Sequence, residues 1–132
     1  MTGWIAIALG DVTGIGPEVT LKALAAEREA DRTRYLLIGD EGYLRRVNET
    51  LGLHLPLQPF DPADASGRFC SYNPLQGPLP LELTPGSPAA AQAALAWLTE
   101  GAQRCLRHEI DALVTAPVNK EAIIRAGNTF VG

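Results

Sequence analysis

The sequence predicts an α/β fold, with a largely parallel β-sheet and flanking helices. Short apolar runs alternate with longer segments of helical periodicity, which is the pattern of parallel strands joined by crossover helices. The first and last apolar runs, at residues 4–9 and 112–115, are each followed by a polar turn that opens a helix. Because 132 residues is the length of one domain, we expect residues 1–132 to form a single α/β domain.

The first predicted strand, residues 4–9, is apolar without interruption, which is typical of a strand covered on both faces. Pro17 then opens a helix that is expected to run towards Ala30, because the first helical position needs no N–H donor. The next strand is predicted at residues 35–38 and ends at Gly39.

Asp40 is the expected N-cap of a second helix, which continues through Leu51 and stops at Gly52. The pattern then changes, since eight of the ten prolines fall between residues 53 and 88. Proline cannot donate to a sheet ladder, so we expect this region to be extended, edge-like or irregular. An alternating pattern within it predicts one half-buried strand that contains Leu79, Leu81 and Leu83.

A long helix is predicted from about residue 89 to 108, with Ser87 as its N-cap and Pro88 at its first position. Trp97 is expected to pack on a face of this helix. Apolar residues recur at intervals of three and four and predict one buried stripe, formed by Ala91, Leu95, Leu98, Ala102, Cys105 and Leu106.

A last strand is predicted at residues 112–115, followed by a short helix over residues 120–126 that Gly127 closes. The residues after Gly127 carry no capping or terminating signal. We therefore expect this sequence to be part of a longer protein.

Composition and charge argue against several classes of protein. The net charge is −4 and lysine and arginine are scattered, so no nucleic-acid partner is expected. The apolar run at residues 4–9 is too short for a signal peptide or a membrane span, so no membrane partner is expected either. Cys70 and Cys105 have no motif spacing and are expected to be reduced packing residues. These features predict a cytoplasmic protein.

The loop after the first strand, at residues 10–18, has the pattern G-D-x-x-G-x-G-P-E. Glycines let the backbone approach a ligand, and the following helix offers free N–H groups and the positive end of its dipole. Asp11, Gly14 and Gly16 are therefore candidates for binding a phosphate or carboxylate. An ordinary strand-to-helix turn stays open as an alternative. Asp11 either accepts a hydrogen bond from a substrate hydroxyl or organises its own turn.

The loop after the last strand places Thr115, Asn119 and Lys120 at the carboxyl edge of the sheet, where ligands bind in open α/β folds. Lys120 would supply a positive charge for a phosphate, with Thr115 and Asn119 as hydrogen-bond donors. The alternative is that Lys120 is a solvated residue of the first helical turn, although a cation there opposes the helix dipole.

No metal ligand, catalytic residue or cofactor-binding residue is assigned from the sequence. His54 and His108 have no cysteine, histidine or carboxylate at metal-ligand spacing. The first loop also differs from the G-x-G-x-x-G dinucleotide fingerprint.

Three motifs resemble the 4-hydroxythreonine-4-phosphate dehydrogenase family of pyridoxine biosynthesis. They are residues 10–18, the Pro85-Gly86 pair before the alanine-rich helix, and residues 115–120, which continue to Ala126-Gly127 and Phe130-Val131-Gly132. The motifs occur in the right order and span essentially the whole chain.

The resemblance implies NAD-dependent oxidation of 4-phosphooxy-L-threonine, followed by decarboxylation, in pyridoxal phosphate biosynthesis. It implies a homodimer of two-domain subunits with an isocitrate/isopropylmalate dehydrogenase-like fold, of which this chain would be the first domain. It also implies a divalent metal (zinc, magnesium or cobalt), held by three histidines, that polarises the hydroxyl being oxidised.

The chain is shorter than members of this family. A His-Thr pair that contacts substrate normally follows Gly132, and the metal histidines and most of the nicotinamide site come later. The resemblance therefore implies the amino-terminal part of such an enzyme, with neither cofactor site complete and no activity alone. Two alternatives stay open: a related dehydrogenase of phosphorylated sugar acids or cis-dihydrodiols, and a non-catalytic α/β module that binds a small anion.

Overall fold

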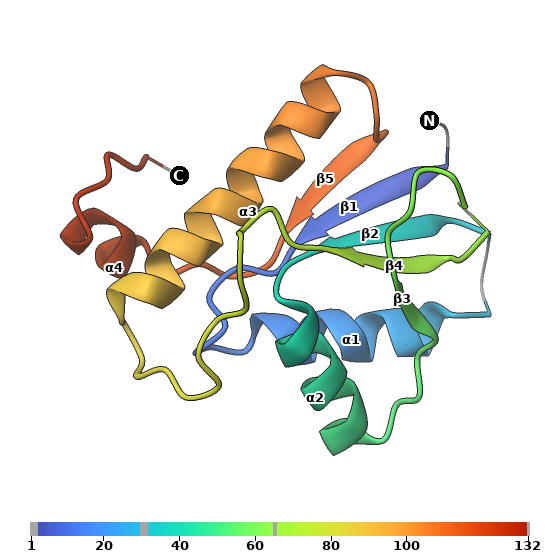
Figure 1. Ribbon diagram of the computed structural model, residues 1–132, viewed down its shortest axis with the longest axis horizontal. Coiled ribbons are helices and arrows are strands. Elements are labelled where there is room, and N and C mark those ends of the chain that lie inside the picture. The colour runs from blue at the N-terminus through green and yellow to red at the C-terminus, as the bar shows by residue number, and fades with distance from the viewer. Residues whose placement is uncertain (1–2, 30–31, 65, 132) are drawn as a thin grey trace.

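The fold is a five-stranded, fully parallel β-sheet with helices on both faces, as the sequence predicts (Figure 1). It is seen in a computed structural model that describes residues 3–29, 32–64 and 66–131. The strands lie side by side in the order β3-β4-β2-β1-β5. Their bounds are Trp4–Ala8 for β1, Arg34–Ile38 for β2, Leu57–Pro59 for β3, Phe69–Tyr72 for β4 and Ala112–Thr115 for β5.

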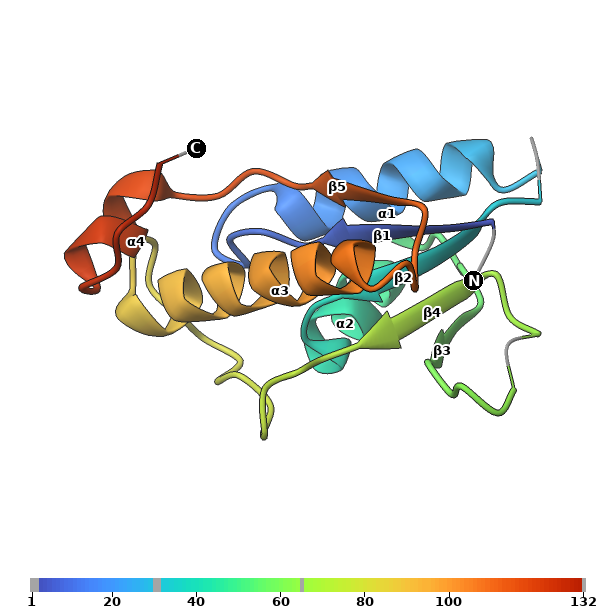
Figure 2. The same cartoon turned by 90° about the horizontal axis from the view of Figure 1, so that it is seen from above.

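Helices α1 (Gly16–Glu27) and α3 (Pro88–Leu106) cover opposite faces of the sheet (Figures 1 and 2). Helix α2 (Glu41–Leu51) packs against α1, and the short helix α4 (Lys120–Arg125) packs against α3. No helix among the described residues has the length and apolar character needed to span a membrane.

The core lies on both sides of the central strands. Trp4, Ala6 and Leu9 have no exposed surface, and Ile7 and Ala8 between them are almost as buried. Burial of successive residues means that both faces of β1 are covered, which confirms the prediction from its unbroken apolar run. Trp97 of α3 is also fully buried and packs into this core, as expected.

Local signals set the helix ends where the sequence predicts them. Asp40 caps α2 by accepting from the backbone N–H of Tyr43 at 3.0 Å, and Gly52 closes it with a left-handed φ of 62°. Ser87 caps α3, with Pro88 at its first position. Helix α1 ends at Glu27, and Ala30, its expected limit, lies outside the described residues.

The strand predicted around Leu79, Leu81 and Leu83 is wrong. Residues 73–86 form an irregular segment, in which Leu81 is 65% exposed. Two side chains at the start of α2 bind this segment through hydrogen bonds. Asp40 accepts from the N–H of Leu79 at 2.7 Å, and the Tyr43 hydroxyl donates to the Pro80 carbonyl at 2.6 Å. The proline-rich region instead contributes two strands elsewhere, β3 and β4, and β3 lies at the edge of the sheet as its prolines require.

The stripe predicted for the long helix is confirmed only in part: Ala91 is buried, Leu95 and Cys105 are partly buried and pack against the core, and Leu98 is half-buried. Leu106 is 79% exposed and Ala102 is also exposed. The buried residues of α3 are mainly small, because this helix lies close to the sheet: a Cβ at Gly101 would lie 2.5 Å from Leu113 Cδ1. The face that packs inward is formed by Ala90, Ala91, Ala93, Ala94, Trp97 and Gly101.

Candidate functional site

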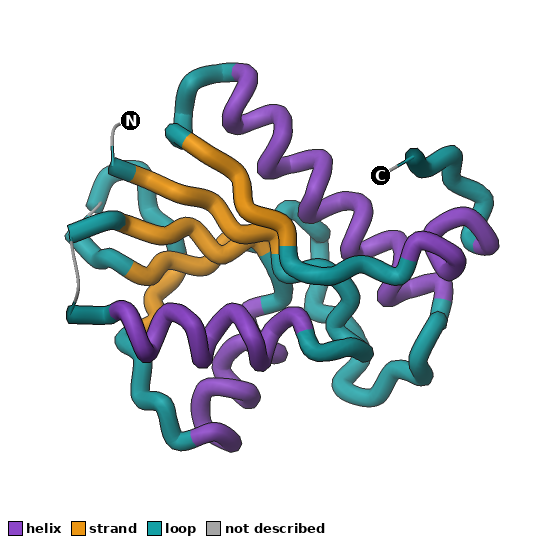
Figure 3. Tube along the Cα trace, turned by 180° about the vertical axis from the view of Figure 1, so that it is seen from behind, coloured by secondary structure: helices purple, strands orange, loops and turns teal. Residues whose placement is uncertain are grey.

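The two loops selected from the sequence leave adjacent strands at one end of the sheet. Strand β1 pairs with β2 on one side and with β5 on the other; helix α1 leads out of β1, and helix α3, on the opposite face, leads into β5. The ends of β1 and β5 therefore form the point where the strand order reverses, the usual place for a ligand in an open α/β sheet. Figure 3 shows the loops after β1 and β5 at this end of the strands.

The two loops are joined by backbone contacts that continue beyond the sheet. The Ala116 N–H donates to the Ala8 carbonyl at 2.9 Å, and the Asp11 N–H donates to the Pro117 carbonyl at 3.0 Å. Gly16 at the start of α1 packs against the same strand ends, since a Cβ there would lie 2.3 Å from the Leu9 carbonyl oxygen. The close packing of α1 on the strand ends therefore explains why residue 16 is a glycine.

Asp11 organises the first loop. Its side chain is 8% exposed, and Oδ1 accepts from the Thr13 N–H at 2.9 Å and from the Thr13 hydroxyl at 2.6 Å. These bonds are those of the turn-organising alternative, and a role towards substrate stays a prediction. Gly14, in contrast, is exposed on the turn.

The second loop presents its three candidate residues on the end of β5 and the start of α4. Thr115 and Lys120 are exposed, and Asn119 is partly exposed. Asn119 Oδ1 accepts from the Ala122 N–H at 3.0 Å and so caps α4, which leaves the amide NH₂ as the part of this side chain suited to donate to a ligand. The structure thus brings the two loops together.

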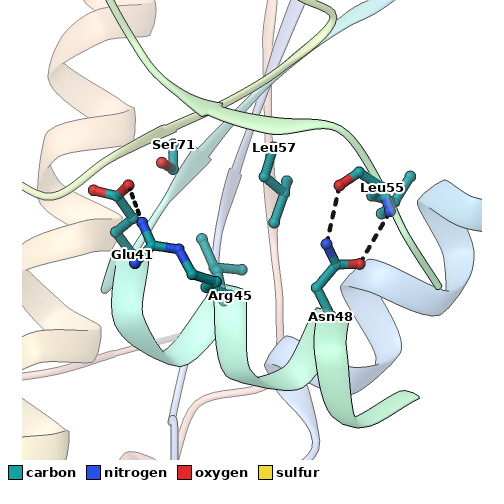
Figure 4. Close-up of a pocket in the computed structure, with 7 residues that line it drawn as sticks. Glu41, Arg45, Asn48, Leu55, Leu57 and Ser71 are labelled. Carbon is teal, nitrogen blue, oxygen red and sulfur yellow. Dashed lines mark hydrogen bonds and ion pairs between the residues drawn. The ribbon is translucent and has the colours of Figure 1, made fainter. Parts of the chain in front are cut away.

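Cavities also occur elsewhere in the described structure. One of about 90 Å³ lies between α2 and strands β3 and β4 (Figure 4). Its polar groups bond to one another: Arg45 pairs with Glu41 at 2.7 Å, and the Asn48 amide makes two hydrogen bonds with the Leu55 backbone, at 2.9 and 3.1 Å. Such groups hold the α2–β3 connection in place.

A second cavity, of about 200 Å³, is an apolar groove between α1 and β5 that adjoins the second loop. Among the residues that line it, Val19 and Val114 are each about half exposed, at 47% and 49%. We call this cavity the α1–β5 groove.

No group of three or more metal-ligating side chains occurs within the described parts of the chain. His54 and His108 lie in left-handed turns, with φ of 54° and 60°, and provide no metal centre with their neighbours. Both cysteines are free, and burial raises the pKa of the Cys70 thiol above its ordinary value. The described residues thus provide no set of three side chains that could hold a divalent metal.

Sequence reasoning missed the meeting of Gly10 with the Pro117 carbonyl. Gly10 stands in the motif of the first loop, and nothing in the sequence pairs it with Pro117. A signal was present, since a glycine directly after a buried strand often marks a close approach of another backbone. Its partner could be found only once β1 and β5 were known to be neighbours.

The fold and the joined loops define an open parallel α/β domain with a candidate ligand-binding edge between β1 and β5. Residues 31–132 match the family model described as "Pyridoxal phosphate biosynthetic protein PdxA". The chain belongs to this PdxA family.

Two curated relatives are dehydrogenases. The 4-hydroxythreonine-4-phosphate dehydrogenase of Desulfosudis oleivorans is 33% identical over 97% of this chain and 39% of its own length. The D-threonate 4-phosphate dehydrogenase of Cupriavidus necator is 35% identical over 97% of this chain and 40% of its own length.

A solved structure supports the same conclusion. The 4-hydroxythreonine-4-phosphate dehydrogenase of Burkholderia phymatum superposes with a TM-score of 0.82 at 32% identity, over 98% of this chain and 40% of that one. The chain thus spans about 40% of the length of the relatives it matches.

Proposed function

We propose that this chain forms the substrate-phosphate side of the active site in a dehydrogenase that oxidises 4-hydroxythreonine-4-phosphate with NAD and then decarboxylates the product. The observation that carries the proposal is the junction of two polar loops at the point where the strand order reverses, in a chain whose relatives are dehydrogenases of phosphorylated substrates.

Each candidate residue has a chemical role in this proposal. Lys120 supplies a positive charge to the phosphate, and Thr115 and the Asn119 amide donate hydrogen bonds to its oxygens. Gly14 leaves the backbone exposed just before α1, and Gly16 lets the start of this helix lie against the end of β1, so that the first N–H groups and the dipole of α1 favour an anion there. Asp11 accepts from a substrate hydroxyl with the oxygen that does not bond Thr13.

The cofactors and the rest of the active site belong to a protein of the relatives' length. NAD and a divalent metal, zinc, magnesium or cobalt, would be bound chiefly by residues beyond the matched portion, since the described residues provide no metal centre. When bound, the metal would polarise the substrate hydroxyl. We propose a cytoplasmic homodimer for the whole protein, and no catalysis by these 132 residues alone.

The proposal is tested by adding 4-hydroxythreonine-4-phosphate to the isolated chain and following backbone amide signals by NMR. We expect shifts at residues 10–16 and 115–120. Lys120→Ala should weaken binding about tenfold or more, because a hydrogen bond to a charged group contributes ~1.5–3 kcal/mol.

Lys22→Ala is the matched control, because it removes the same charge from the exposed surface of α1, where Lys22 pairs with Glu18 at 2.8 Å. Equal losses in the two lysine variants would exclude a specific role for Lys120. In a full-length protein, the same pair of variants is compared by KM and kcat for NADH formation. An unchanged KM in Lys120→Ala would remove this residue from the site.

A phosphorylated sugar acid is the second candidate substrate. The Cupriavidus necator relative acts, by its name, on D-threonate 4-phosphate, and its identity to this chain is close to that of the Desulfosudis oleivorans relative. Titration with both phosphorylated compounds separates the two assignments, since the preferred substrate should bind more tightly.

A further inference from the structure

We infer that Gly10 is a positioning residue of the candidate site, which sets the spacing between its two loops; this inference rests on the proposed function. The contact lies just beyond the ends of β1 and β5, where the Asp11 N–H donates to the Pro117 carbonyl at 3.0 Å. For this bond to form, the two backbones must meet at position 10.

Position 10 accommodates glycine and no larger residue. Its φ is +70°, a left-handed conformation that is unfavourable for residues with a Cβ atom. A Cβ there would lie 2.2 Å from the Pro117 carbonyl oxygen and 2.8 Å from that of Ala116. Both obstacles are backbone atoms of the second loop. A side chain at position 10 therefore forces that loop away from the first.

Displacing the second loop would move the groups proposed to hold the phosphate. Asn119 follows Pro117 by two residues and caps α4, and Lys120 is the first residue of that helix. On the other side of the contact, the Asp11 carboxylate holds the Thr13 turn through two hydrogen bonds. Gly10 thus acts through Pro117 and Asp11, and is not itself a ligand to the substrate.

Gly10→Ala tests this role, with inorganic phosphate as the probe. We expect phosphate affinity to fall about tenfold or more, because the loss of one hydrogen bond to a charged ligand is enough for a change of this size. We also expect the amide signals of Asn119 and Lys120 to shift in the NMR spectrum of the unliganded variant, since these residues move with Pro117.

Two other glycines provide matched controls. Gly52→Ala imposes a similar conformational cost, since φ is +62°, but a Cβ there meets no atom within 4 Å. Gly39→Ala imposes a collision that does not involve the second loop, since its Cβ would lie 2.3 Å from Leu9 Cδ1, a side-chain atom in the core. Both controls should lose stability and keep the phosphate affinity of the wild type.

The inference is overturned if Gly10→Ala binds phosphate as tightly as Gly39→Ala, or if its Asn119 and Lys120 signals coincide with those of the wild type. If the wild type itself does not bind phosphate, the proposed function fails, and the amide signals alone decide whether Gly10 sets the spacing. If Gly10→Ala does not fold, hydrogen exchange of the wild-type protein shows whether the junction between Asp11 and Pro117 is formed. Protection of the Asp11 amide like that of Ala116 supports the junction, and exchange at the rate of an exposed loop contradicts it.

Discussion

The two edges of the sheet are built in opposite ways. At one edge, β3 has only three residues, one of them Pro59, and Pro56 and Pro62 flank the strand. At the other edge, β5 reads Ala-Leu-Val-Thr without a proline, and no strand among the described residues pairs with its outer side. The exposed Val114 and the α1–β5 groove lie beside this open edge.

This difference indicates which edge is made to face water. Short strands and prolines protect a sheet edge from pairing with other chains, whereas an open apolar edge is a template for pairing. Parallel sheets are also normally buried on both faces. The β3 edge therefore has the features of an edge exposed to solvent. The β5 edge has the features of a strand that another part of a protein covers.

The largest effect is expected on self-association of the isolated chain, measured by analytical ultracentrifugation. The wild type should associate with rising concentration, and Val114→Lys should raise the dissociation constant about tenfold or more. The reason is that burying a valine contributes ~1.5–3 kcal/mol, which a charged lysine forfeits. Pro59→Lys, with the same change in charge at the other edge, should leave the association unchanged. Equal effects of the two variants would show that net charge, and not the β5 edge, controls self-association.

A smaller effect is expected on stability, because the connections leading to the two edge strands are held differently. Asn48→Ala removes two partly buried hydrogen bonds to Leu55 and should lower the free energy of unfolding by about 1–3 kcal/mol. Asp111→Ala removes one exposed bond, from the Gly3 N–H at 2.6 Å, and should cost about 0.5 kcal/mol. Urea unfolding compares them, and an equal loss in both variants would contradict the tighter hold on the β3 side.

The smallest effect concerns Cys70, which lies in β4 beneath the β3 edge. Burial raises the pKa of its thiol above the ordinary 9.0, so the unfolded chain loses this proton at lower pH than the folded one. Stability should therefore fall as pH rises above about 9, and Cys70→Ala should reduce this slope.

Alkylation should also label the half-buried Cys105 before Cys70. Equal labelling rates would show that the β3 edge opens readily.

Elements with local signals could be predicted from the sequence. The caps Asp40 and Ser87 and the apolar run of β1 depend on neighbouring residues alone, and the structure confirms all three. Strand β4 was missed because its four residues are held by pairing with β2 and β3, which are distant in sequence. The stripe of α3 was misjudged because close packing on the sheet selects alanine and glycine, and leaves Leu106 outside.

The candidate site could be predicted only in part, for the same reason. Each loop carries its own pattern of glycine, proline and polar residues. That the loops touch, and that Gly10 is where they do so, follows from the adjacency of β1 and β5. The order of elements along the chain does not fix this adjacency.

The pairing of β1 with β5 also has a consequence for how the molecule folds. Ile5 of β1 pairs with Ala112 of β5, so synthesis must proceed past residue 112 before this contact can form. Contacts between such distant residues close large loops and form slowly. We therefore expect β1 to pair with β2 before β5 is available, and the junction at Gly10 to form late in the assembly of this sheet.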